Sequence, residues 1–132
     1  MADVMMALGE YRFSIDTAAL QSIREVHAWR WADHNLTGRK PRSQFIGGEL
    51  STLRFQGTIY PHFRGGLGQT SKMKAEGDKG KPLRLIDGLG HDLALWTIRS
   101  LEVDKTNLFT KGVARKIEFT IEIKEYADEV VL

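Results

Sequence analysis

The residues that could do chemistry gather at positions 60–82, YPHFRGGLGQTSKMKAEGDKGKP, where five glycines lie among lysines. Backbone N–H groups of such loops can cradle phosphate where a strand leads into a helix. However, the stretch lacks the Gly-Lys-Ser or Gly-Lys-Thr step of a Walker loop, and Thr70 and Ser71 interrupt the dinucleotide pattern after Gly68. We therefore expect no cofactor here, and expect the glycines to turn the chain sharply from a strand into a helix.

Metal binding and nucleophilic catalysis are the other chemistries to weigh. The four histidines could join Asp87 or Asp92 around zinc, but they are scattered and show no H-x-x-x-H spacing. A serine or threonine nucleophile is left open by spacing alone, although no G-x-S-x-G motif is present. We expect neither a metal site nor a catalytic residue. The histidines are His27, His34, His62 and His91.

Basic and aromatic residues could form a binding surface. The cluster GRKPR at positions 38–42 could touch phosphates, but such a cluster is more typical of a solvated loop or a protein contact. Trp96 lies in a strand pattern and is expected in the core. Trp29 and Trp31, which flank an arginine, could equally belong to the core or to an interface.

Composition narrows the class of protein. The chain has 132 residues, of which 42% are hydrophobic and 27% charged, so we expect one folded domain over residues 1–132. The net charge of +2 argues against a nucleic-acid binder, and the lack of cysteine excludes disulfides and thiolate metal sites. No apolar run approaches a membrane span and the first residues do not resemble a signal peptide, so we expect neither membrane binding nor export.

Period-two alternation predicts the strands that position these residues. It is clearest at 113–126, where four apolar residues alternate with polar ones, and it recurs at 52–60 with Gly57 at an apolar position. At 93–104 the apolar phase shifts near Arg99 and Ser100, which predicts a bulge. The polar connection that follows predicts that 93–104 and 113–126 pair as an antiparallel hairpin. The four apolar residues are Ile117, Phe119, Ile121 and Ile123.

The remaining elements are weaker. We expect strands at 7–15, 24–31 and 82–87, a turn at 88–92 and a loop at 35–48. A helix is expected at 67–77, capped by Thr70 or Ser71, with Met73 and Ala75 facing inward and Gly77 at its end. The predicted fold is therefore mainly antiparallel β, a β-sandwich or partial barrel with one flanking helix.

The segments MALGEYRFSI, TIYPHFRGGLGQ, LIDGLG and ARKIEFTIEIKEY resemble, in order and spacing, the tail protein U (GpU) family of contractile-tailed phages. The resemblance spans residues 5–126, and YPHFRGGLGQ is its most specific part. It implies a tail-tube-like fold and a non-enzymatic structural role in a phage tail or a related contractile bacteriocin. The expected function is a ring that initiates the tail tube above the baseplate hub.

The resemblance also implies partners and a site. We expect a homo-oligomer in a sixfold ring in the virion tail, assembled in the host cytoplasm, beside tail tube, baseplate hub and LysM-type tail proteins. DNA would only pass through the channel. The corner after the strand at 52–60, with the two tryptophans, is expected to contact a neighbour. The interface residues are Tyr60, Pro61, His62, Phe63, Arg64, Gly65, Gly66, Gly68, Trp29 and Trp31.

Other functions remain open on the sequence alone. A tail terminator or completion ring at the head end would share the fold and differ in its neighbours. A small cofactor-binding oxidoreductase and a nucleic-acid-binding barrel that uses GRKPR and the tryptophans belong to different classes. Cofactor spectroscopy and salt-dependent DNA retention, respectively, would reveal them.

Overall fold

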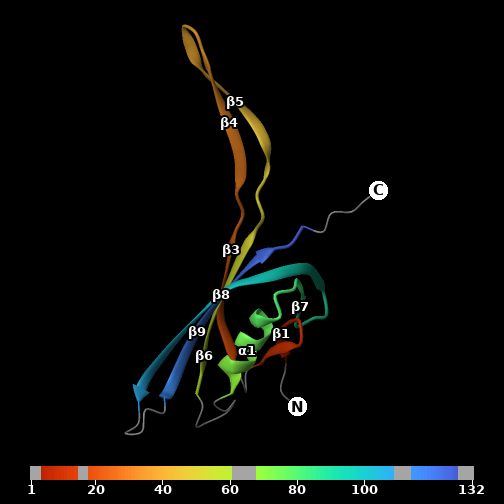
Figure 1. Cartoon of the computed structure of the whole chain (residues 1–132), viewed down its shortest axis with the longest axis vertical. Coiled ribbons are helices and arrows are strands. Elements are labelled where there is room, and N and C mark those ends of the chain that lie inside the picture. The colour runs from red at the N-terminus through yellow and green to blue at the C-terminus, as the bar shows by residue number, and fades with distance from the viewer. Residues whose placement is uncertain (1–3, 15–17, 61–67, 109–113, 128–132) are drawn as a thin grey trace.

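A computed structural model of the chain describes residues 4–14, 18–60, 68–108 and 114–127. Figure 1 shows a body that contains the helix, and a long arm of two strands that projects from it. The elements are β1 (Val4–Leu8), β2 (Tyr11–Ser14), β3 (Ala19–Val26), β4 (Trp29–Leu36), β5 (Arg39–Gly48), β6 (Thr52–Ile59), α1 (Gln69–Asp78), β7 (Leu83–Asp87), β8 (Asp92–Leu108) and β9 (Ala114–Glu125).

The body is one antiparallel sheet of seven strands in the order β2-β1-β7-β8-β9-β6-β3. Its centre is the predicted hairpin, in which β8 and β9 pair from Trp96 opposite Glu125 to Leu108 opposite Ala114. The register of this pair shifts between Ile98 and Ser100, which confirms the predicted bulge. The remaining two strands, β4 and β5, pair only with each other and form the arm.

The sheet curls, so its two outer strands approach each other. Phe13 lies on the outermost strand β2, yet its ring centre is 6.0 Å from that of Phe55 on β6 and 6.1 Å from that of Phe119 on β9. In a flat sheet of this order those strands would be far apart, and the other outer strand, β3, also contacts β2. The prediction of a mainly antiparallel partial barrel with one helix is confirmed.

The inner face of this curl holds the core. Alternate side chains of β9 are buried as predicted, and so are those of β6. Position 57 on β6 requires glycine, because a Cβ atom there would lie 2.3 Å from the Ala19 carbonyl oxygen and 2.5 Å from the Phe119 ring. A larger residue would therefore separate β3 from β6 or displace the central phenylalanine. The buried residues of these two strands include Leu53, Phe55, Ile59, Ile117, Phe119, Ile121 and Ile123.

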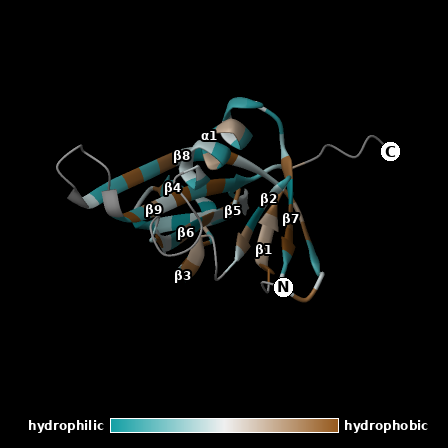
Figure 2. Ribbon diagram, turned by 90° about the horizontal axis from the view of Figure 1, so that it is seen from below, coloured by the Kyte–Doolittle hydropathy of each residue, from teal (hydrophilic) through white to brown (hydrophobic). Residues whose placement is uncertain are grey.

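Helix α1 lies over β8 on the core side of the sheet (Figure 2). Met73 is buried as predicted, but Ala75 is exposed, and the inward positions are instead Gln69 and Glu76. The predicted cap is also wrong, because the helix begins after Gly68 without a side-chain cap. Polar partners make the two polar positions possible, since the Tyr11 hydroxyl donates to Gln69 Oε1 at 2.9 Å.

Glu76 ties the helix to the turn between β1 and β2. Its Oε1 accepts a hydrogen bond from the Glu10 backbone N–H at 2.8 Å, and its Oε2 lies 2.5 Å from Lys79 Nζ. Burial opposes ionisation of this carboxyl, but the hydrogen bonds from Lys79 and the backbone outweigh it and lower its pKa. Glu76 is therefore held as a carboxylate that anchors the helix.

Three further sequence predictions need correction. The strand expected at 7–15 is broken by the turn at Gly9, whose φ of +61° favours glycine, and the strand at 24–31 is interrupted between Val26 and Trp29. The loop expected at 35–48 is mostly strand β5. A strand forms here although it has no face to bury, because β4 supplies its hydrogen bonds. The short strand and turn expected at 82–92 are confirmed. No helix in the described ranges is long and apolar enough to cross a membrane.

Candidate interaction surface

The arm formed by β4 and β5 continues the outer edge of the body sheet. Strand β3 leads into β4 and β5 leads back into β6, the partner of β3. At the joint the Glu49 N–H donates to the Ala28 carbonyl oxygen at 2.9 Å, and His27 Nδ1 lies 2.7 Å from Ser51 Oγ. At ~3.3 Å per residue, the eight residues of β4 carry the arm about 25 Å from the body.

The arm exposes aromatic side chains on a ribbon that no second layer covers. Trp31 pairs across the strands with Phe45, their ring centres 5.0 Å apart in an edge-on arrangement. These two rings are 60% and 52% exposed, and Trp29 on the same strand is 62% exposed. Since soluble proteins seldom expose clustered aromatic residues, this surface is suited to contact another protein.

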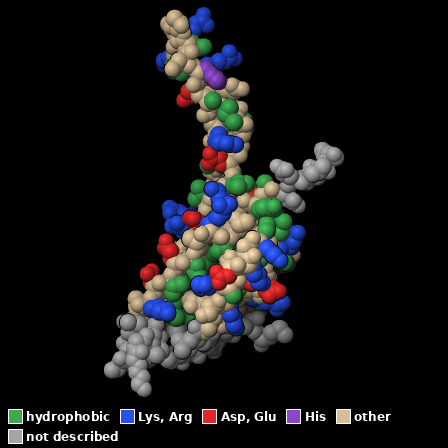
Figure 3. Space-filling view, in the orientation of Figure 1, with side chains coloured by type: hydrophobic (Ala, Val, Ile, Leu, Met, Phe, Trp, Pro, Cys, Tyr) green, Lys and Arg blue, Asp and Glu red, His purple; other side chains and the backbone are tan. Residues whose placement is uncertain are grey.

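The far end of the arm is basic and polar. Arg39, Lys40 and Arg42 are exposed, and none of them forms an ion pair with a carboxylate among the described residues. Figure 3 shows basic side chains at this end and hydrophobic ones nearer the body. The GRKPR cluster thus begins an exposed strand rather than a loop.

The three tryptophans lie in two different regions of the molecule. Trp96 is 8% exposed and its Nε1 donates to the Leu93 carbonyl oxygen at 2.8 Å, so the expected core position is confirmed. Trp29 and Trp31 lie outside the core, on the arm. Sequence patterns do not identify Phe45 as their neighbour, because it lies in a segment without apolar alternation.

Only the ends of the predicted strand-to-helix corner can be placed. Tyr60 follows β6 and is 50% exposed, and Gly68 precedes α1 with open space around it. Residues Pro61, His62, Phe63, Arg64, Gly65 and Gly66 lie outside the described residues. The structure brings neither end of this corner next to the arm tryptophans, so the predicted interface comprises two separate regions.

The described histidines pair with polar side chains close to them. His34 Nε2 lies 2.8 Å from Gln44 Oε1, and His91 Nδ1 lies 3.0 Å from Asp87 Oδ2. Hydrogen bonds from His91, its backbone N–H foremost, lower the Asp87 pKa. Across the described parts of the chain, no three His, Asp or Glu side chains group closely enough to hold a metal ion; His62 lies outside them. The Asp87 carboxylate therefore stabilises the turn that follows it, by hydrogen bonds to the Leu89 and His91 backbone N–H groups.

Comparisons with known proteins agree on one kind of relative. The family model described as Phage P2 GpU matches residues 9–128. Over 126 residues the chain is 29% identical to the "Probable tape measure protein" of Halomonas phage phiHAP-1. That match covers 94% of this chain but only 14% of the phage protein.

A solved structure shares the fold. It is described as the tail of an empty GTA particle with C6 symmetry, and one of its chains superposes with a TM-score of 0.52. The superposition covers 95% of this chain and 92% of that chain at 13% sequence identity. At this identity the likeness shows a shared fold and nothing further about function.

Proposed function

Because the chain belongs to the Phage P2 GpU family, we propose that it is a non-enzymatic structural protein of a phage-type tail. In this proposal residues 1–132 form one tail-tube-like domain, and identical copies assemble into a ring that initiates the tail tube above the baseplate hub. The ring occupies the virion tail after assembly in the host cytoplasm.

The exposed arm is the observation that carries this proposal. A two-stranded ribbon on its own is marginally stable in water, and here it also leaves Trp29, Trp31 and Phe45 more than half exposed. A chain that lacks a layer to cover these residues gains stability when a neighbouring subunit supplies one. Such a need suits an assembly protein better than an enzyme, which requires a cavity with convergent polar groups.

The relatives support the ring and its setting. The GTA tail with the shared fold has C6 symmetry, and the phage relative is described as a tape measure protein. We therefore propose six copies per ring, with tail tube, baseplate hub and LysM-type tail proteins as further partners. Identical head-to-tail contacts close into a ring when the rotation between copies returns to the start, and closure then covers every exposed sheet edge.

Two regions of the chain are proposed as interfaces. The arm, with Trp29 and Trp31, contacts a neighbouring copy. The corner from Tyr60 to Gly68 contacts a second neighbour or an adjacent ring. It follows the end of β6 at Ile59, whereas the arm precedes the start of β6 at Thr52.

Removal of the arm tests the function. Residues 29–48 are replaced by an Asn-Gly turn, which the joint allows because Ala28 and Glu49 already hydrogen-bond across the ribbon. We expect the body to keep its folding transition while rings and complete tails are lost. The matched control is Lys72→Ala on the exposed side of α1, which should leave both unchanged.

The readouts separate assembly from folding. Size-exclusion chromatography with light scattering reports the ring, thermal unfolding reports the body, and electron microscopy of tails locates the ring. Normal tails from the armless variant would refute the proposal. Rings at the head end would indicate a terminator instead of an initiator.

A further inference from the structure

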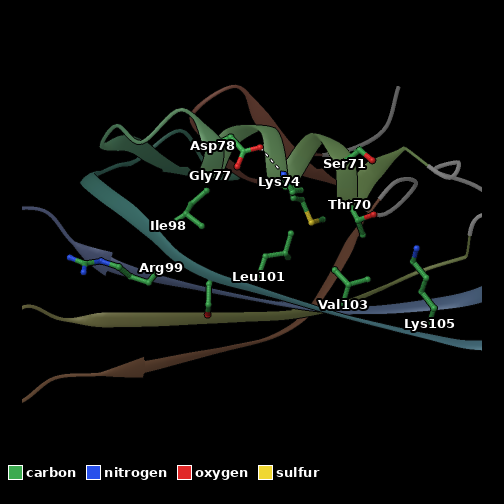
Figure 4. Close-up of a pocket in the computed structure, with 12 residues that line it drawn as sticks. Thr70, Ser71, Lys74, Gly77, Asp78, Ile98, Arg99, Leu101, Val103 and Lys105 are labelled. Atoms are coloured by element: carbon green, nitrogen blue, oxygen red, sulfur yellow. Dashed lines mark hydrogen bonds and ion pairs between the residues drawn. The ribbon is translucent and has the colours of Figure 1, made fainter.

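A groove runs between α1 and β8 on the core side of the sheet (Figure 4). Its volume is about 610 Å³, and its floor is formed by the half-buried side chains of Ile98, Leu101 and Val103. In the close-up these side chains point toward the helix. The groove is therefore an apolar trough with one helical wall.

The groove exists because the helix is shorter than the strand it covers. The ten residues of α1 span about 15 Å, whereas the seventeen residues of β8 extend about 55 Å. Gly77 widens the trough further, since it lines the groove without a side chain. Apolar positions of β8 that face the core side thus remain partly in contact with water.

The rim of the groove carries unneutralised positive charge. Lys74 is paired with Asp78 at 2.9 Å along the helix. Arg99 donates from Nε to Thr97 Oγ1 at 3.0 Å, and neither Arg99 nor Lys105 has a carboxylate partner among the described residues. An occupant with apolar side chains and a nearby carboxylate would suit this site.

One face of the arm has that composition. Trp31 and Phe45 lie opposite each other, and the next pair on the same face is Asp33 opposite Ser43, joined by a 2.6 Å hydrogen bond. Asp33 is exposed and forms no ion pair with any described cation. Pockets of ~300–1,000 Å³ bind drug-sized ligands, so the groove has room for two aromatic rings.

We propose that the α1–β8 groove of one copy receives Trp31 and Phe45 from the arm of another copy, with Asp33 at one end of the groove, beside either Arg99 or Lys105. A chain cannot fill its own groove, because its arm leads away from the body that holds α1 (Figure 1). The inference rests on the proposed ring and names the contact that closes it.

The size of the contact favours a ring over a dimer. The exposed parts of these two rings amount to roughly 200 Å², given the 150–250 Å² that an aromatic side chain buries. Together with the groove walls this falls well below the ~1,200–2,000 Å² of a stable pairwise interface. In a closed ring each copy makes the contact twice, once with its arm and once with its groove, and body contacts add to it.

Cysteine cross-linking tests the contact directly, because the chain has no cysteine of its own. A chain with Ser43→Cys on the arm and Ser71→Cys on the groove wall is oxidised and run on a non-reducing gel. We expect a ladder of covalent oligomers up to the full ring. Each single-cysteine control can form only dimers.

The outcomes distinguish this inference from the proposed function. Rings without a ladder, or a cross-link within one chain, would overturn the groove contact and leave the ring intact as a proposal. Absence of both rings and ladder would overturn both.

A groove-filling variant gives independent evidence. At Gly77 a Cβ atom would lie 3.6 Å from Ile98 Cγ2, an ordinary contact, so Gly77→Leu fills the trough without a clash at its base. We expect Gly77→Leu to weaken association at least about 30-fold, as the loss of a buried aromatic anchor would. Its thermal transition should not fall, since leucine favours helix more than glycine does. Unchanged ring formation by this variant would contradict the proposal.

Discussion

The body and the arm are built from the same antiparallel pairing, but only the body has a layer behind it. In the body, Phe119 on β9 is 1% exposed, whereas Phe45 on β5 is 52% exposed although it too faces an aromatic partner. Strand pairing therefore determines the shape of both regions, while burial stabilises only one. The arm retains apolar surface that a second molecule can cover.

The largest expected effect comes from the same substitution made in both regions. Phe119→Ala should lower the free energy of unfolding by about 3–5 kcal/mol because it leaves a cavity in the core. Phe45→Ala should change that value by less than about 0.5 kcal/mol, since its side chain is already exposed. Urea unfolding of the isolated protein measures both values.

Ring assembly should depend on Phe45 and not on Phe119, the reverse of the effect on folding stability. Under conditions where both variants are folded, Phe45→Ala should lose rings and Phe119→Ala should form them. A destabilised body in Phe45→Ala would mean that the arm packs on its own chain, and would remove the contrast.

Glycines with positive φ provide the next matched pair. Gly9 has a φ of +61°, and a Cβ atom there would lie 2.7 Å from Glu76 Oε1. Gly9→Ala should therefore cost about 1–3 kcal/mol of unfolding free energy. Gly38 on the arm has a φ of +70° with open space around it, so Gly38→Ala should leave the unfolding of the body unchanged. Equal losses would show that the arm and body unfold as one unit.

Acid should weaken the body through Glu76. Its folded pKa lies below the ordinary 4.5, so its contribution is fully present above pH 4.5 and is lost as pH falls through the folded pKa. Glu76→Gln should thus cost about 1 kcal/mol at pH 7, and that difference should shrink below pH 4.5. Thermal unfolding across roughly pH 3–7 measures this difference. A difference that does not change with pH would rule out the carboxylate as the cause.

The smallest effect is expected at the ion pair on the arm. Arg30 Nε lies 4.0 Å from Glu49 Oε1, and both side chains are about half exposed. Water screens such a pair, so Arg30→Ala should change the unfolding free energy by less than about 0.5 kcal/mol. Any larger loss in the isolated protein would place this part of the arm in a more buried setting than the structure shows.

Much of the body could be predicted from the sequence because burial leaves a period-two record. The alternation around Phe119 gave β9, and the change of phase near Arg99 gave the bulge in β8. The arm left no such record. Strand β5 contains Pro41 and has solvent on both faces, so nothing in its composition distinguishes it from a loop.

The candidate surface could be predicted from the sequence only in part. Tryptophan type alone identified Trp29 and Trp31 as interface candidates, but their partner Phe45 depends on the arm register. Glu76 was missed because a charged residue is rarely buried. Its burial requires Lys79 and the Glu10 backbone, which approach only in the folded chain.

The joint at Ala28 and Glu49 is the point about which the arm could rotate relative to the body. Its two strands cross this point next to Gly47 and Gly48, and a turn of about 10° there would move the far end of a 25 Å ribbon by about 4 Å. Neighbours at slightly different spacings could thus be reached by one sequence through a single pivot. A rotation at this joint would change the position of the arm, while the side chains that the arm presents stay the same.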